Sequence, residues 1–84
     1  MKLTIVPSDL LVVKDNEPHN VADLSYLDSN IHAIQWDEDK GEIEYKDGTV
    51  NEAITDISPY NQCVTDWETA KDEYIKATTP ATPN

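Results

Sequence analysis

The segment 31–54 constrains the fold more than any other, because its apolar residues alternate with polar ones between clear turn signals. Residues 31–36 read Ile-His-Ala-Ile-Gln-Trp, and residues 42–46 read Glu-Ile-Glu-Tyr-Lys. Such alternation is typical of strands with one buried face and one exposed face. Residues 49–54 return as a third strand, so the segment predicts an antiparallel three-stranded meander.

Two turns join these strands and set their register. Residues 37–40 form a polar loop, and Asp47-Gly48 favours a tight hairpin because both central positions of a type I′ turn need positive φ. The resulting cross-strand pairs are Trp36–Gly41, Ile34–Ile43, His32–Tyr45, Tyr45–Val50 and Lys46–Thr49. One face then collects Ile34, Trp36, Ile43, Tyr45, Val50 and Ile54. The other face collects Gln35, Glu42, Glu44, Lys46 and Asn51. A slip by one residue would exchange the faces of a strand.

The segment after the meander predicts an amphipathic helix of about 18 residues, because its apolar positions recur every three to four residues. Ser58 is a suitable N-cap, and Pro59 suits the first helical position. The apolar stripe consists of Tyr60, Cys63, Val64, Trp67, Ala70 or Lys71, and Tyr74. Docking this stripe on the apolar face of the meander covers both surfaces. We therefore expect Trp36 and Trp67 in the core, in contact with each other across the boundary between sheet and helix.

The first 30 residues have a weaker pattern. Residues 2–6 and 10–14 are expected to be two strands around a break at Pro7-Ser8-Asp9. Residues 15–18 are expected to form a turn. Residues 22–27 are compatible with a loop or with a short helical turn.

Together these elements predict an α+β fold, an antiparallel β-meander of four to five strands packed against one C-terminal amphipathic helix. The domain is expected to span residues 1–77, because 84 residues supply one modest core. Residues 78–84 contain two prolines and no apolar period, which predicts a flexible Thr/Pro tail.

The charge balance excludes several classes of function. The chain has 17 acidic residues and six lysines, with a formal net charge of −11. Direct nucleic-acid binding is not expected, because such proteins neutralise phosphates with clustered basic residues. No apolar stretch approaches the length of a membrane span. The apolar start, residues 1–6, is too short for the core of a signal peptide.

The residue types that usually carry chemistry are few. An EF-hand loop starting at Asp37 would need glycine at its sixth position and glutamate at its twelfth, but these positions hold Glu42 and Gly48. One cysteine cannot build a zinc site. No phosphate-binding or nucleophile motif is found. We therefore predict a protein that is not an enzyme, with no catalytic, cofactor-binding or metal-binding residues and no cofactor.

The two histidines and the cysteine have structural interpretations. Cys63 lies on the apolar stripe of the helix, which predicts a buried and inert thiol. His32 is expected to share a sheet face with Tyr45, packed or at its rim. His19 follows Pro18 in the expected turn and is predicted to be exposed to solvent. A small hydrolase or metal protein using His32 and two acids is a further alternative.

Acidic residues concentrate around the first turn of the meander. The candidate interaction surface consists of Asp37, Glu38, Asp39, Glu42 and Glu44. A rigid array of carboxylates can imitate the phosphates of a duplex and occupy a basic groove. Charge on the outer side of a sheet also keeps a protein soluble and discourages aggregation between sheet edges. Composition alone does not separate these roles.

Several blocks of the chain carry a resemblance to known proteins. They are Met1–Pro7, Ile31–Trp36, Gly41–Tyr45, Asn51–Ile54 and the helix with Trp67. Over residues 1–77 the chain resembles a family of small proteins encoded by tailed bacteriophages, including marine and cyanobacterial phages, often near tail genes. The strongest block of the resemblance is 31–54.

The resemblance implies a non-enzymatic structural or assembly protein associated with the phage virion or tail. Its expected partners are phage structural or tail proteins, or further copies of itself, and its expected location is the virion or the host cytoplasm. Neither direct nucleic-acid contact nor membrane contact is expected. The alternative is an acidic inhibitor that mimics DNA and binds a host defence or nucleic-acid enzyme.

Overall fold

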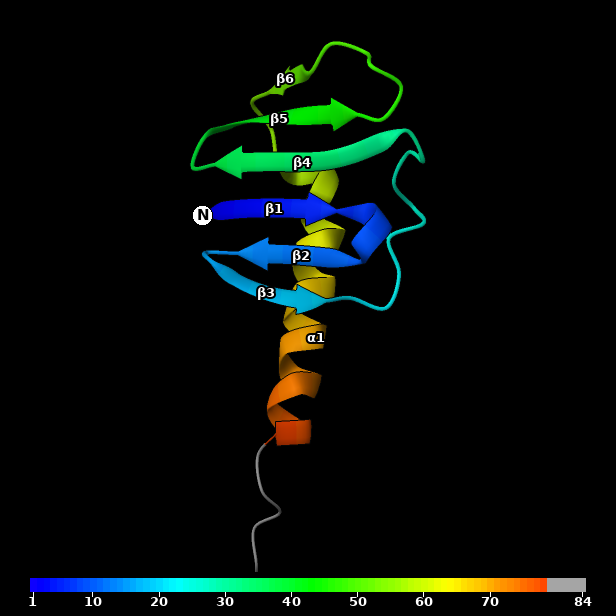
Figure 1. Cartoon of the computed structure of the whole chain (residues 1–84). Helices are drawn as coiled ribbons and strands as arrows, with labels where there is room; N and C mark the ends of the chain where they lie inside the picture. The colour runs from blue at the N-terminus through cyan, green and yellow to red at the C-terminus, as the bar shows by residue number, and fades with distance from the viewer. Residues whose placement is uncertain (79–84) are drawn as a thin grey trace, which may run out of the picture.

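A six-stranded antiparallel sheet backed by one helix makes up residues 1–78, the part of the chain that the computed structural model describes (Figure 1). The strands are β1 (Lys2–Val6), β2 (Leu11–Lys14), β3 (Glu17–Asn20), β4 (Ile31–Asp37), β5 (Lys40–Tyr45) and β6 (Glu52–Ile54). The 3₁₀ turns η1 (Pro7–Asp9) and η2 (Ser58–Tyr60) precede β2 and the helix α1 (Asn61–Thr78). The order across the sheet is β3-β2-β1-β4-β5-β6. The predicted α+β class is confirmed, with six strands instead of four to five.

The additional strand is β3, which the sequence pattern did not predict. The expected turn at 15–18 is shorter, because Asp15 and Asn16 alone turn the chain, with φ of 50° and 70°. Pro18 then lies inside an edge strand. The N–H of Val21 donates to the carbonyl of Leu10 at 2.8 Å. Because every second residue of an antiparallel strand bonds to its partner strand, the nitrogen of Pro18 faces away from β2, where no donor is needed. Proline therefore costs β3 no ladder hydrogen bond.

The register between β4 and β5 follows the prediction at its centre and departs from it at one end. Trp36 faces Gly41 and Ile34 faces Ile43, as expected. The predicted pairing of His32 with Tyr45 is wrong, because the register shifts between Ile31 and Ala33. His32 is the extra residue of this irregularity and is exposed to solvent. Ile31 faces Tyr45 instead, and its side chain is buried.

Strand β6 keeps the register that the Asp47-Gly48 turn predicts but is much shorter than expected. Ile43 faces Glu52 and Gly41 faces Ile54, while pairing stops before the turn. The predicted place of Val50 on the apolar face is therefore wrong, since this residue is 86% exposed. The carboxylate of Asp47 accepts the backbone N–H of Thr49 at 2.9 Å, which holds a local turn in place of a continued ladder.

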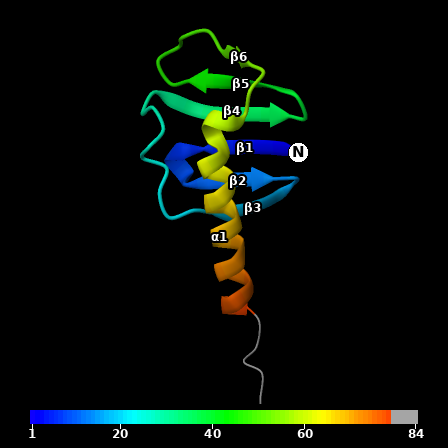
Figure 2. The ribbon, with the colours of Figure 1, turned by 180° about the vertical axis from the view of Figure 1, so that it is seen from behind.

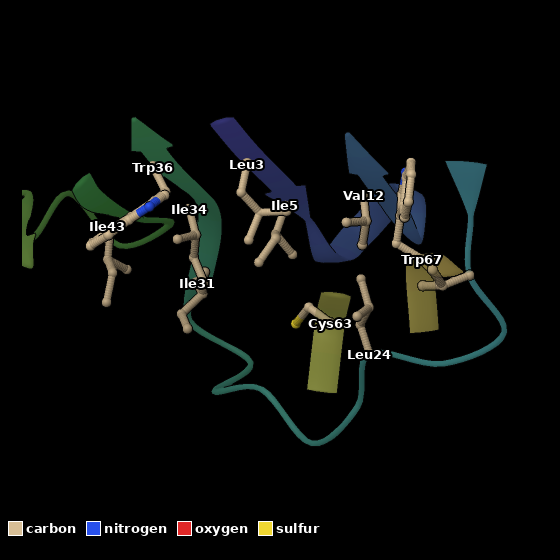
Figure 3. Close-up of a cluster of buried hydrophobic side chains, with 11 residues drawn as sticks. Leu3, Ile5, Val12, Leu24, Ile31, Ile34, Trp36, Ile43, Cys63 and Trp67 are labelled. Atoms are coloured by element: carbon tan, nitrogen blue, oxygen red, sulfur yellow. The ribbon is translucent and has the colours of Figure 1, made fainter. Parts of the chain in front are cut away.

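The core lies between α1 and one face of the sheet (Figures 2 and 3). The sheet contributes Leu3, Ile5, Val12, Ile31, Ile34, Trp36 and Ile43, and other segments contribute Val21, Leu24, Cys63 and Trp67. Both tryptophans are buried as predicted, and so is Cys63. The predicted contact between Trp36 and Trp67 is wrong, because the two rings stand at opposite ends of the cluster (Figure 3). Trp36 belongs to β4, whereas α1 brings Trp67 against the β2–β3 end of the sheet.

The two ends of α1 differ from the prediction. Ser58 does not cap the helix, because its N–H and hydroxyl both donate to the carboxylate of Asp56, and η2 precedes the first α-helical residue. At the other end α1 runs past the edge strand β3 (Figure 2). Tyr74, expected on the buried stripe, is therefore 58% exposed. Thr78 still belongs to α1, and the rest of the predicted tail lies outside the described residues.

Candidate functional site: the open face of the sheet

No helix of residues 1–78 covers the side of the sheet opposite α1, which Figure 1 views directly. Because strand side chains alternate between faces, the residues next to buried Leu3 and Ile5 point to this side. We call it the open face. It is formed by Lys2, Thr4, Val6, Leu11, Val13, Pro18, Asn20, Ala33, Gln35, Asp37, Lys40, Glu42, Glu44 and Ala53.

The chemical character of the open face changes from one edge to the other. Strands β1 and β2 contribute the apolar half, which consists of the partly exposed side chains of Val6, Leu11 and Val13. Strands β4 and β5 contribute the acidic half, which consists of Asp37, Glu42 and Glu44. A depression reaches from Val13 on β2 past Gln35 on β4 to Glu42 on β5. One face therefore offers apolar contacts and negative charge side by side.

The predicted interaction surface is only partly assembled on this face. Asp37, Glu42 and Glu44 lie on the open face, whereas Glu38 and Asp39 form the turn at its end. The Glu38 carboxylate pairs with the amino group of Met1 at 3.1 Å. Asp37 is in register with Lys2 on β1 and with Lys40 on β5, which offset its charge. The surplus of negative charge is therefore centred on Glu42 and Glu44.

A second cluster of polar groups lies on the opposite side of the sheet, where α1 crosses β3. The predicted exposure of His19 is wrong, because its side chain is only 9% exposed. The His19 ring packs against the rings of Trp67 and Tyr74, with centroid distances of 5.6 and 5.3 Å. Its Nε2 lies 2.6 Å from a carboxylate oxygen of Glu17. The sequence placed His19 in a turn, but β3 carries it beneath the helix.

The remaining contacts of this cluster attach α1 to β3. The indole N–H of Trp67 donates to the carbonyl of Glu17 at 2.8 Å, and the Lys71 ammonium donates to the Glu17 carboxylate at 3.2 Å. The ammonium groups of Lys14 and Lys71 lie 4.9 and 5.1 Å from the centroid of the Trp67 ring. Cation–π contacts and a buried indole hydrogen bond favour this packing. We assign the cluster a role in holding the helix on the sheet.

The other reactive groups of the described chain are engaged in packing. Burial raises the pKa of the Cys63 thiol, which keeps it in its neutral form. The Tyr26 hydroxyl lies 3.4 Å from Cys63 Sγ and donates to the Asp66 carboxylate at 2.7 Å. Within residues 1–78, no group of three or more His, Cys, Asp or Glu side chains is arranged to hold a metal ion. The described helices are also too short or too polar to cross a membrane.

The Glu17 carboxylate predicts a pH-dependent part of the stability. Hydrogen bonds from His19 and then from Lys71 hold the pKa of Glu17 below its ordinary value of 4.5. A lowered folded-state pKa means that this stabilisation is present above pH 4.5 and is lost as the pH falls through the folded-state pKa. Glu17→Gln should therefore be less stable than the wild type near neutral pH, and the difference should shrink on acidification.

Urea unfolding at a series of pH values from about 7 to about 3 measures this difference. Glu68→Gln is the matched control, because Glu68 is exposed on α1. The control should follow the wild type at every pH. A difference between wild type and Glu17→Gln that stays constant across the series would contradict the assignment.

Comparison with protein-family models, with curated proteins and with solved structures gave no match to this chain.

Two features of the structure were not predicted from the sequence. The apolar half required the strand pairing of β1 with β2, which places Val6 opposite Leu11. The Glu17–His19 pair had a signal in the sequence, since residues two apart in a strand share a face, but the proline between them favoured a turn.

Proposed function

We propose that the protein is a non-enzymatic structural or assembly protein of a phage virion or tail, and that it acts by protein–protein contact through the open face. The observation that carries the proposal is the partly exposed apolar half beside the acidic half on an uncovered sheet face. An apolar strip with a charged rim is the usual make-up of a protein-binding surface.

The phage assignment has its support in the resemblance over residues 31–54 and the Trp67 helix. Residues 31–54 contain β4, β5 and β6, which include the acidic half of the open face. The part of the chain that most resembles the phage family is thus also the part that carries the surplus negative charge. A shared contact surface would account for this coincidence.

Mass spectrometry of purified particles of the phage that encodes the protein tests the proposal. We expect the protein in the particles, or in complexes with virion or tail proteins isolated during infection. The double variant Glu42→Lys/Glu44→Lys should be depleted from the particles and complexes at least severalfold, because the reversed charge on this face would repel a partner that complements the carboxylates. Absence of the wild-type protein from both particles and complexes would refute the proposal.

The DNA-mimic alternative draws on the net charge of −11 and on Glu42 and Glu44, which follow each other on one face of β5. Lys2 and Lys40 interrupt the row of carboxylates at Asp37, which weakens the likeness to a row of phosphates. Capture of a basic nucleic-acid enzyme from host lysate at low salt, with release by added DNA, would favour this alternative over an assembly role.

A further inference from the structure

We propose that the open face docks an amphipathic helix of a partner protein, with an apolar stripe over Val6, Leu11 and Val13 and lysines or arginines facing Glu42 and Glu44. This inference rests on the proposed function, since it names the kind of partner that the same face receives. The arrangement would give the sheet a second helical layer opposite α1.

The edges of the sheet are poorly suited to receive a partner strand. At one edge, Pro18 removes a backbone donor that would point outward from β3. At the other edge, β6 has three residues, Glu52–Ile54. A strand added at either edge would find few hydrogen-bonding groups. The uncovered face is therefore the more suitable contact surface.

The occupant of a sheet face must satisfy its own backbone hydrogen bonds, because the ladder groups of the sheet are already paired. A helix meets this condition, since its backbone N–H and C=O groups bond within the segment. The apolar half spans two strands, a width of the order of the 10 Å diameter of a helix. The apolar half would thus receive the apolar stripe of one helix.

Charge decides which helix fits. Glu42 and Glu44 lie on the same face as the apolar half, with β4 alone between β5 and β1, so the flank of the docked helix must oppose these two carboxylates. Neither carboxylate has an ion pair among the described residues, whereas Asp37 has Lys2 and Lys40 beside it. Basic side chains on the partner complement this surplus. A second copy of the chain fits poorly, because two copies carry −22 (twice −11).

Binding of a synthetic peptide measures the inference directly. The probe is a helical peptide of about 15 residues with a leucine stripe and a lysine flank, compared with a twin whose lysines are glutamates. Fluorescence polarisation at about 20 mM and about 300 mM salt reports affinity and its electrostatic share. We expect the lysine peptide to bind, to weaken severalfold at the higher salt, and to bind far more tightly than the glutamate twin.

Two sets of variants locate the contact. Glu42→Lys/Glu44→Lys should raise the Kd by about tenfold or more, whereas Glu68→Lys/Glu73→Lys, with the same change of net charge on exposed positions of α1, should raise it much less. Leu11→Thr/Val13→Thr replaces two apolar side chains of β2 by threonine, which is β-branched and suits a strand. This variant should weaken binding at least threefold, because it removes the apolar contact. Circular dichroism verifies that each variant is folded.

In the peptide experiment, three results would overturn the inference: no binding of the lysine peptide, equal binding of the glutamate twin, or equal loss in the two charge variants. A dimer formed through the open face, detected by sedimentation and abolished by Leu11→Thr/Val13→Thr, would also overturn it. The proposed function fails separately, through absence from particles and complexes. A protein present in virions that does not bind the lysine peptide would refute this inference alone.

Discussion

Replacing Trp67 by alanine should lower the free energy of unfolding by about 3–5 kcal/mol. The ring is 5% exposed and is part of the buried cluster between α1 and the sheet. Alanine removes this apolar area, leaves a cavity, and also removes the hydrogen bond to the Glu17 carbonyl. Urea unfolding followed by circular dichroism measures the loss. A decrease below about 1 kcal/mol would mean that this cluster does not hold α1 on the sheet.

The two tryptophans supply an internal control through their phenylalanine variants. The indole N–H of Trp67 has an acceptor, whereas that of Trp36 is buried with no hydrogen-bond partner among the described residues. Trp67→Phe loses a hydrogen bond and Trp36→Phe removes an unsatisfied donor. We therefore expect Trp67→Phe to cost about 1–2 kcal/mol more than Trp36→Phe. An equal cost would contradict the assigned role of the Trp67 hydrogen bond.

Replacing Gly41 by valine should destabilise the protein by about 3 kcal/mol or more. A Cβ at this position would press against the carbonyl oxygen of Gln35 and lie 2.9 Å from Cε3 of the Trp36 ring. The backbone of β4 cannot move away without disturbing its pairing with β5, so β-branched side chains are the worst choice. Urea unfolding of Gly41→Val and of Gly41→Ala measures the effect, and the smaller side chain should cost less.

Gly48→Ala is the matched control for Gly41. A Cβ at Gly48 meets nothing within 4 Å, but the φ of +84° disfavours any side chain. Only backbone strain acts there, so we expect a loss of about 1 kcal/mol. If Gly41→Val proved no more costly than Gly48→Ala, the close approach of β4 and β5 at Gly41 would not matter for stability.

Several features of the fold were predictable because their causes are local. Alternation in 31–36 and 42–46, with a turn between them, was enough to place Trp36 opposite Gly41 and Ile34 opposite Ile43. The three- to four-residue spacing after Ser58 likewise placed Cys63 and Trp67 on one side of a helix. Such patterns depend on the period of a strand or helix, which the neighbouring residues alone impose.

Other features depended on which segments became neighbours. Pro18 disfavours a central strand but is harmless on the outer side of an edge strand, and only the sheet order decides which of these applies. Tyr74 continues the helical stripe, yet it is exposed because the sheet ends at β3 before α1 does. The irregularity at His32 follows from the pairing of Ile31 with Tyr45, which no local pattern indicated.

The candidate site divides in the same way. The sequence alone determined that the protein is strongly acidic and that Glu42 and Glu44 share one side of a strand, because charge and alternation are properties of the chain itself. Only the tertiary structure decided that β1 pairs with both β2 and β4, which places Val6, Leu11 and Val13 on the same face of the sheet as those acids. The physical reason is that strand order results from burying one shared core, and that burial determines which side of each strand is left for a partner.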